Sequence, residues 1–245
     1  MKKRVTLLLS ALLVAVVVSA GEKVSETRKL GGFEKIEING SPKVVYTQGK
    51  TVSVRIEGNR ESIDNIETSV SDNTLYVRNK GKMGIVNFTF GNDDAVVYVT
   101  TPDLIGIKLN GSGDFISKQR IDTDRINIVL RGSGDINLKD IICDVCNLSL
   151  VGSGDLDVDR LEARDVDASL IGSGDLDIAL LQVNLTRLSL KGSGDVKANF
   201  AQGCRAVDCQ LNGSGDIMLS GKVKRFTKQK RGSGDIHTAK LTIEK

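Results

Sequence analysis

Apolar and polar residues alternate through most of the chain around a tetrapeptide that recurs. Gly-Ser-Gly-Asp begins seven times at intervals of 19–21 residues, at Gly111, Gly132, Gly152, Gly172, Gly192, Gly213 and Gly232. A leucine stands two residues before the first glycine in six copies, and an apolar residue directly follows the aspartate in all seven. Alternation with a period of two predicts short strands that bury one face.

The regular interval predicts that these strands stack as successive coils. One coil cannot enclose its own apolar face, whereas stacking pairs every strand in parallel and in register with its copies above and below. No apolar spacing of three and four residues persists, which excludes an α-helical solenoid. We therefore predict an all-β fold, a parallel β-helix (β-solenoid) with about 20 residues per coil.

The tetrapeptide predicts a tight corner in each coil, because glycine adopts backbone angles closed to other residues. Stacked corners place their aspartates about 4.8 Å apart, and neighbouring carboxylates then repel by roughly 1 kcal/mol even in water. Two explanations remain open. Each carboxylate accepts backbone N–H groups of its own turn, or the row binds cations.

Residues 33–110 have a β pattern that is less regular. Asn39-Gly40-Ser41 looks like a degenerate corner, with Pro42-Lys43 in place of Gly-Asp. Further strands are expected at 51–57, 74–78, 86–90 and 95–100, with a loop or short helix at 58–64. We expect irregular, enlarged coils over 33–110 that cover the end of the regular solenoid of 111–245, in one continuous domain.

The N-terminus has the pattern of a secretory signal peptide. Lys2, Lys3 and Arg4 precede an apolar run, and Val18-Ser19-Ala20 offers a cleavage site. The run is shorter than the roughly 20 residues that span a bilayer. We expect residues 1–20 to be removed and 21–32 to form a flexible leader. The mature protein would be exported, to the periplasm, outer-membrane surface or medium, with no transmembrane segment.

Removal of these three basic residues brings the formal net charge of +3 close to zero. A neutral chain lacks the basic footprint of a nucleic-acid-binding protein, so this class of partner is set aside.

The segment from Ile36 to Gly49, IEINGSPKVVYTQG, followed by the Gly-Ser-Gly-Asp series, resembles the head GIN domain family. Its members are described as auto-transporter adhesins and are frequent in Bacteroidetes. The resemblance spans about 33–240 and implies an exported β-helical protein with no catalytic residues to carry over. An autotransporter also needs a barrel of alternating strands after its head. No such strands precede Lys245, so we expect the adhesin head alone.

Two groups of residues are candidate binding sites. Asp155, Asp157, Asp175 and Asp177 on adjacent coils form an oxygen-rich patch of the kind that calcium favours. The repeat resembles part of the calcium β-roll repeat, but its period is 20 rather than nine residues. The second group is basic and lies in the last coil: Lys222, Lys224, Arg225, Lys228, Lys230 and Arg231. It is either an end cap that prevents further stacking or a patch for anionic polysaccharide or lipid head groups.

Four cysteines fall at apolar positions of the repeat: Cys143, Cys146, Cys204 and Cys209. We expect buried thiols rather than a metal site, with local disulfides left open.

Catalysis has little support. The single histidine, His237, has no nucleophile motif near it. Asp157 and Asp177 could imitate the paired carboxylates of polysaccharide-cleaving enzymes, but repetition alone explains them. We expect a non-enzymatic, adhesin-like interaction protein without cofactor, which binds an unknown glycan or protein ligand at the cell surface. The alternatives are a structural envelope protein, a calcium-binding repeat protein and, last, a polysaccharide-cleaving enzyme.

Overall fold

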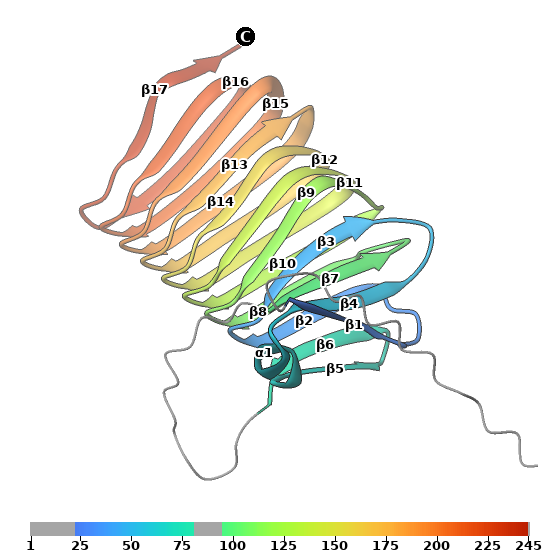
Figure 1. Ribbon diagram of the computed structural model, residues 1–245. Helices are drawn as coiled ribbons and strands as arrows, with labels where there is room; N and C mark the ends of the chain where they lie inside the picture. The colour runs from blue at the N-terminus through green and yellow to red at the C-terminus, as the bar shows by residue number, and fades with distance from the viewer. Residues whose placement is uncertain (1–22, 81–94, 245) are drawn as a thin grey trace, which may run out of the picture.

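The computed structural model describes residues 23–80 and 95–244, and it confirms the β-solenoid. Coils stack in one direction from the N-terminal to the C-terminal end (Figure 1). The signal peptide and the strand expected at 86–90 lie outside the described residues.

The regular part consists of strands that bend around the coil. They are β8 (Gly106–Gly111), β9 (Asp114–Asp122), β10 (Arg125–Gly132), β11 (Asp135–Gly152), β12 (Leu156–Gly172), β13 (Leu176–Leu181), β14 (Val183–Gly192), β15 (Val196–Gly213), β16 (Ile217–Arg231) and β17 (Ile236–Ile243). All pairings among them are parallel. Each coil thus has a strand that enters the Gly-Ser-Gly-Asp corner and one that leaves it, which we call the entry side and the exit side.

The degenerate corner predicted at Gly40 stacks directly on the first Gly-Ser-Gly-Asp corner. β2 (Lys35–Gly40) pairs with β8, which places Gly40 opposite Gly111. β3 (Lys43–Gln48) pairs with β9, which places Lys43 opposite Asp114. The ammonium group of Lys43 lies 3.1 Å from the Asp114 carboxylate. A cation therefore stands where the later coils carry an aspartate.

The N-terminal end is irregular, as expected, and antiparallel strands close it. On the exit side, β7 (Val96–Thr101) pairs in parallel with β3, and then β4 (Ser53–Gly58) and β1 (Val24–Arg28) add antiparallel. On the entry side, β6 (Thr74–Asn79) pairs in parallel with β2, and β5 (Ile66–Ser71) adds antiparallel. Reversed strands break the coil repeat, so stacking ends here. Part of the expected leader, β1, belongs to this closure.

A short helix, α1 (Arg60–Asp64), lies within the segment predicted as a loop or short helix. The Asn59 side chain accepts a hydrogen bond from the Ser62 N–H at 2.8 Å and so caps the helix. Ile63 is fully buried and fills the space beneath the closing strands.

The aligned apolar positions form columns inside the solenoid. The leucine column, Leu109, Leu130, Leu150, Leu170, Leu190 and Leu211, is at most 2% exposed. Burial of each such side chain stabilises the fold by about 2 kcal/mol. Ladders of this kind account for the cohesion between coils.

The corner aspartates form hydrogen bonds to the neighbouring coil. Each carboxylate of Asp135, Asp155, Asp175, Asp195 and Asp216 accepts the backbone N–H of the aspartate in the following coil, at 2.7–3.2 Å. The N–H groups of the same turn were one of the two explanations left open by the sequence. Stacking brings the next coil's N–H within reach, so the carboxylates tie neighbouring coils together and a row of cations is not needed to offset their repulsion.

Differences in coil length are confined to one bend. The register shifts of the stacked coils lie between Leu138 and Asp140, Val158 and Leu161, Phe200 and Cys204, and Met218 and Ser220. Each shift follows the exit strand, so the Gly-Ser-Gly-Asp corners remain aligned.

Candidate binding surfaces

The four aspartates proposed for calcium are brought together on the exit side. Asp157 lies directly opposite Asp177 on the adjacent coil. Burial, and then the charges of Asp177, Asp155 and other aspartates, raises the pKa of Asp157. Asp155 and Asp175 already accept N–H groups. Over 23–80 and 95–244, no group of three or more Asp, Glu, His or Cys side chains is arranged to hold a metal ion.

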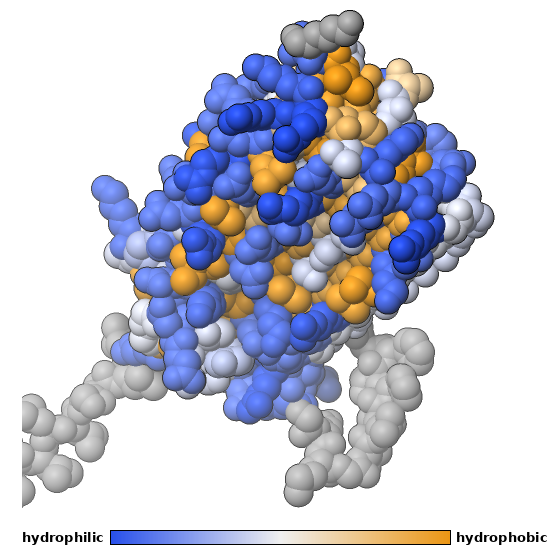
Figure 2. All heavy atoms as spheres, turned by 180° about the vertical axis from the view of Figure 1, so that it is seen from behind, coloured by the Kyte–Doolittle hydropathy of each residue, from blue (hydrophilic) through white to orange (hydrophobic). Residues whose placement is uncertain are grey.

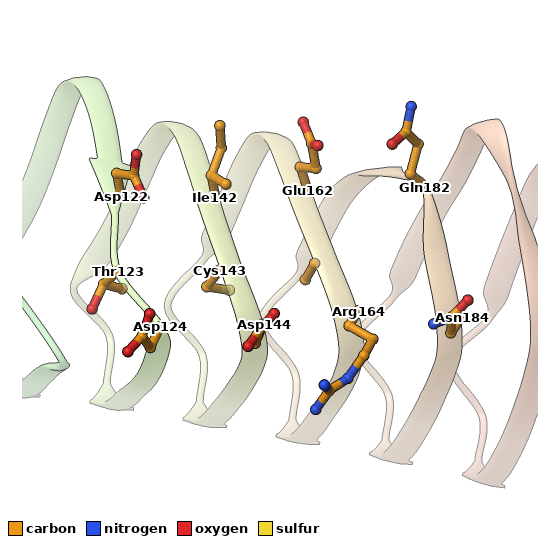
Figure 3. Close-up of a pocket in the computed structure, with 11 residues that line it drawn as sticks. Asp122, Thr123, Asp124, Ile142, Cys143, Asp144, Glu162, Arg164, Gln182 and Asn184 are labelled. Carbon is orange, nitrogen blue, oxygen red and sulfur yellow. The ribbon is translucent and has the colours of Figure 1, made fainter.

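A polar groove of about 380 Å³ crosses the coils between the exit strand of one corner and the entry strand of the next, and the sequence analysis did not predict it. Figure 3 shows three rows of side chains along it. Asp122, Ile142, Glu162 and Gln182 form one rim, and Asp124, Asp144, Arg164 and Asn184 form the other. Thr123, Cys143 and Ala163 lie between the rims. The groove is hollow at this row because these three side chains are small. A column of small residues at this position of the repeat was the sequence feature that could have predicted the groove.

The chemistry of the groove is that of a hydrogen-bonding, mainly acidic surface. Four carboxylates and two amides line it, with Arg164 as its one basic lining residue. Arg164 lies 3.2 Å from the Asp165 carboxylate beside the groove. The Thr123 hydroxyl is buried without a hydrogen-bond partner. A small polyhydroxylated or cationic molecule matches these groups better than an anion does.

The cysteines are buried as predicted, with exposed fractions of 2–9% for Cys209, Cys204 and Cys143 and 0% for Cys146. All four are free thiols.

The six basic residues all lie on β16, which forms the C-terminal coil. Lys228 and Lys230 occupy the core columns, opposite Cys209 and Leu211 of the preceding coil. Both lysines are nevertheless exposed. They are exposed because β17 pairs only with the first half of β16, from Ile217 to Val223, so the described chain places no coil over the second half.

Over residues 23–80 and 95–244, four of these basic residues have no acidic partner. Lys222 pairs with Glu244 at 3.2 Å, and Lys230 pairs with Asp235. Within the part of the chain that the structure describes, no carboxylate lies within 4.0 Å of the cationic groups of Lys224, Arg225, Lys228 and Arg231. Figure 2 shows hydrophobic (orange) surface at the upper, C-terminal end of the solenoid. Near this end Leu241 is partly buried and Ile243 is 57% exposed. The end of the solenoid therefore combines unpaired cations with incompletely covered core.

His237 belongs to the same end. Its Nε2 lies 3.1 Å from the Asp216 carboxylate, and the Asp235 N–H together with His237 lowers the pKa of Asp216. Across the described ranges, no helix is long and apolar enough to cross a membrane.

Fold and surfaces together define an all-β solenoid that presents ladders of side chains along its sides and a basic terminal coil. The chain belongs to the family described as "Putative auto-transporter adhesin, head GIN domain", which matches residues 32–206 and 187–245. This confirms the resemblance found in the sequence. No curated protein matches the chain.

Solved structures share the fold. A putative adhesin from Bacteroides fragilis is 24% identical, with a TM-score of 0.77 over 89% of this chain and 97% of that one. A putative lipid binding protein from Parabacteroides distasonis is 20% identical, with a TM-score of 0.68 over 92% and 98%. A putative adhesin from Parabacteroides merdae is 17% identical, with a TM-score of 0.63 over 92% and 98%. These likenesses concern the fold alone.

Proposed function

We propose that this protein is an exported, non-enzymatic interaction scaffold of the cell envelope that binds an anionic polymer through its C-terminal coil. The observation that carries this proposal is the set of four unpaired cations on β16: Lys224, Arg225, Lys228 and Arg231. Adhesion is the function named for the family and for two of the structural neighbours described above, which supports an interaction role.

The shape of the basic coil fits an extended partner. The six basic residues span 222–231 of β16, and this stretch includes the bend in register with the one at Asp144 and Val145. The basic residues therefore lie on two sides of the terminal coil, which a long polymer chain can contact together. Exposed cations attract anions through solvent, so such binding weakens as salt rises. The chemistry shared by the possible ligands is a row of negative charges. An acidic polysaccharide supplies one, and an anionic lipid surface, in keeping with the name of the Parabacteroides distasonis neighbour, supplies another.

The experiment compares two variants that lose the same charge. In the first, Lys224, Arg225, Lys228 and Arg231 are changed to Gln. In the control, four exposed lysines without ion pairs elsewhere are changed to Gln: Lys23, Lys29, Lys50 and Lys118. Each protein is passed over immobilised polygalacturonate at low and physiological salt, and a neutral polysaccharide serves as the blank.

We expect the native protein and the control to be retained and the first variant to elute with the blank. Equal retention of both variants would overturn the proposal, and the basic residues would then serve only as an end cap. Co-sedimentation with vesicles that contain phosphatidylglycerol, compared with phosphatidylcholine alone, separates a lipid source of the charge from a glycan. Release of unsaturated or reducing sugars from the polymer would instead favour the polysaccharide-cleaving alternative.

A further inference from the structure

Cys143 and Cys146 converge inside one coil from the two sides of a bend. Their side chains face the interior, whereas the two residues between them, Asp144 and Val145, are exposed and half-buried. The N–H groups of Asp144 and Val145 both donate to the carbonyl of Asp124 in the preceding coil, at 2.9 and 3.3 Å. The preceding coil therefore holds the bend, and the two buried thiols lie on either side of it.

Cys143 is the less buried of the two thiols. It is 9% exposed and lines the groove beside Thr123 (Figure 3), whereas Cys146 is fully buried. The hydrogen bond with Cys146 lowers the pKa of Cys143, and the same bond together with burial raises the pKa of Cys146. A thiol at a groove with a lowered pKa, three residues from a second thiol with a raised pKa, is an arrangement that favours disulfide exchange.

The other two cysteines lack this arrangement although one of them occupies a comparable place. Val207 is in register with Cys146 through Val166 and Thr186. Cys204 precedes Val207 by three residues, as Cys143 precedes Cys146, so a valine stands where the second thiol would be. The Cys204 sulfur instead lies 3.6 Å from the Thr186 hydroxyl. Burial raises the pKa of Cys204, and it raises that of Cys209 to about 12.

We propose that Cys143 and Cys146 form a thiol–disulfide exchange site whose oxidant is a low-molecular-weight disulfide. The Cys143 thiolate attacks one sulfur of the disulfide, forms a mixed disulfide and releases a first thiolate, which takes up the proton lost by Cys143. The Cys146 thiol then loses its proton, and its sulfur attacks the Cys143 sulfur and expels the second thiolate, which takes up that proton. Two protein thiols become one disulfide, and the external disulfide becomes two thiols. The proposal does not depend on the ligand of the basic coil.

The test uses the whole folded chain in buffers of oxidised and reduced glutathione. Exchange is quenched with acid, free thiols are alkylated after unfolding, and the products are mapped by mass spectrometry. We expect the native protein to lose two hydrogens, in a peptide pair that joins Cys143 to Cys146. Cys204 and Cys209 should be recovered as alkylated thiols.

Three variants borrow residues from neighbouring coils, so that each keeps a side chain that the repeat already accommodates. Cys146→Val copies Val166 and should stop at the mixed disulfide, with one glutathione on Cys143. Cys143→Ala copies Ala163 and should leave Cys146 unreacted. Cys204→Val with Cys209→Leu copies Val183 and Leu188 and should react like the native protein. Circular dichroism verifies that each variant is folded.

Two results would overturn the proposal. One is a folded native protein whose Cys143 and Cys146 remain free in a buffer that oxidises the unfolded chain. The other is a Cys204–Cys209 disulfide that forms as readily as the expected one, since the hydrogen-bonded pair would then have no special reactivity.

Discussion

At the scale of single residues, the two glycines of each corner are required for different reasons. Gly152 has φ +141, and Gly154 does not need a left-handed backbone. A Cβ on Gly154 would nevertheless lie 1.9 Å from the carbonyl oxygen of Gly134 in the coil below. Close approach of backbone to backbone, rather than local conformation, therefore excludes a side chain at the second glycine.

Gly154→Ala should lower the free energy of unfolding by about 3 kcal/mol, because neighbouring corners must move apart. Gly203→Ala is the matched control: its φ is +92, but the nearest atom to its Cβ would be 3.9 Å away. This control should lose only about 1 kcal/mol, from the backbone strain. Urea denaturation followed by circular dichroism measures both. A smaller effect at Gly154 than at Gly203 would contradict the stacking argument.

Asp157→Asn should stabilise the protein at neutral pH. Desolvation and the neighbouring aspartates raise the pKa of Asp157, so the folded protein binds its proton more tightly than the unfolded chain does. The ionised form is thus the less stable one in the fold, and stability falls as pH rises through the folded pKa. The gain for the variant should be a few tenths to about 1 kcal/mol at pH 7, typical of a like-charged cross-strand pair. It should vanish below the ordinary carboxyl pKa of about 3.9.

Thermal unfolding at pH 7 and pH 3 measures this difference, with Asp167→Asn on the entry side as the control. Equal stability of the variant and the native protein at pH 7 would show that Asp157 and Asp177 do not repel. The same samples examine calcium: a cation held by Asp155, Asp157, Asp175 and Asp177 would raise the melting temperature of the native protein but not that of Asp157→Asn. Titration calorimetry without heat would remove the calcium alternative.

At the scale of elements, the coil separates into parts that keep register and one part that does not. The Gly-Ser-Gly-Asp corners pair residue for residue from Gly111 through Gly213. The bend after the exit strand absorbs the differences in length, and it contains Gln182, Gly203 and Gly221, all with positive φ. Left-handed residues turn the chain there without a requirement for alignment with the next coil.

One inserted glycine should therefore have opposite consequences at the two bends. After Gln202 it should lower the melting temperature by about 2–4 °C, equivalent to about 1 kcal/mol for a chain of this size. Between Ser173 and Gly174 it should abolish a single cooperative transition, because a shift of one residue turns buried side chains outward. Thermal scans by circular dichroism measure both. Similar losses at the two bends would show that the corner is not what aligns the coils.

Sequence alone predicted the coils because the copies share residue types at fixed positions. Every copy has glycines at the corner and an apolar residue after the aspartate, and six of the seven have a leucine two residues before the first glycine. The sequence did not predict features that depend on which backbone lies next to which. The Asp175 carboxylate accepts a hydrogen bond from the N–H of Asp195. Only the spacing between stacked coils brings these two groups together. The antiparallel pairing of β1 and β4 depends on contacts at the end of the stack. These strands lie outside the repeated segments, so the repeat does not predict how they pair. The groove needed three small residues, Thr123, Cys143 and Ala163, on consecutive coils.

At the scale of the whole molecule, the two ends of the solenoid differ. The N-terminal end has reversed strands and α1, with Ile63 fully buried. The C-terminal end has Lys228 and Lys230 in the core columns, where their aliphatic stems can cover Cys209 and Leu211 while the ammonium groups stay in water. We infer that reversed strands close the first end and that charge closes the second. The second kind of closure leaves the edge of β16 from Arg225 to Arg231 available to a ligand, so capping and binding are compatible.

If the charge of Lys228 and Lys230 prevents other chains from pairing with the last coil, replacing these lysines by the apolar residues of earlier coils should allow that pairing. The double variant Lys228→Ile with Lys230→Leu gives the last coil the same residue types as Ile128 and Leu130. These positions lie on a part of β16 that pairs with β15 on one side, and its other edge is unpaired in the described chain. An exposed apolar edge of this kind pairs with another chain. We expect dimers or larger species at micromolar concentration in sedimentation velocity, where the native protein shows less association. Lys224→Gln with Arg231→Gln removes the same charge from outward positions and should leave association unchanged.

If both double variants associate equally, net charge and not the position of the lysines prevents association of the solenoid. If neither associates, the lysines do not cap it, and their place in the core columns then favours the binding role alone.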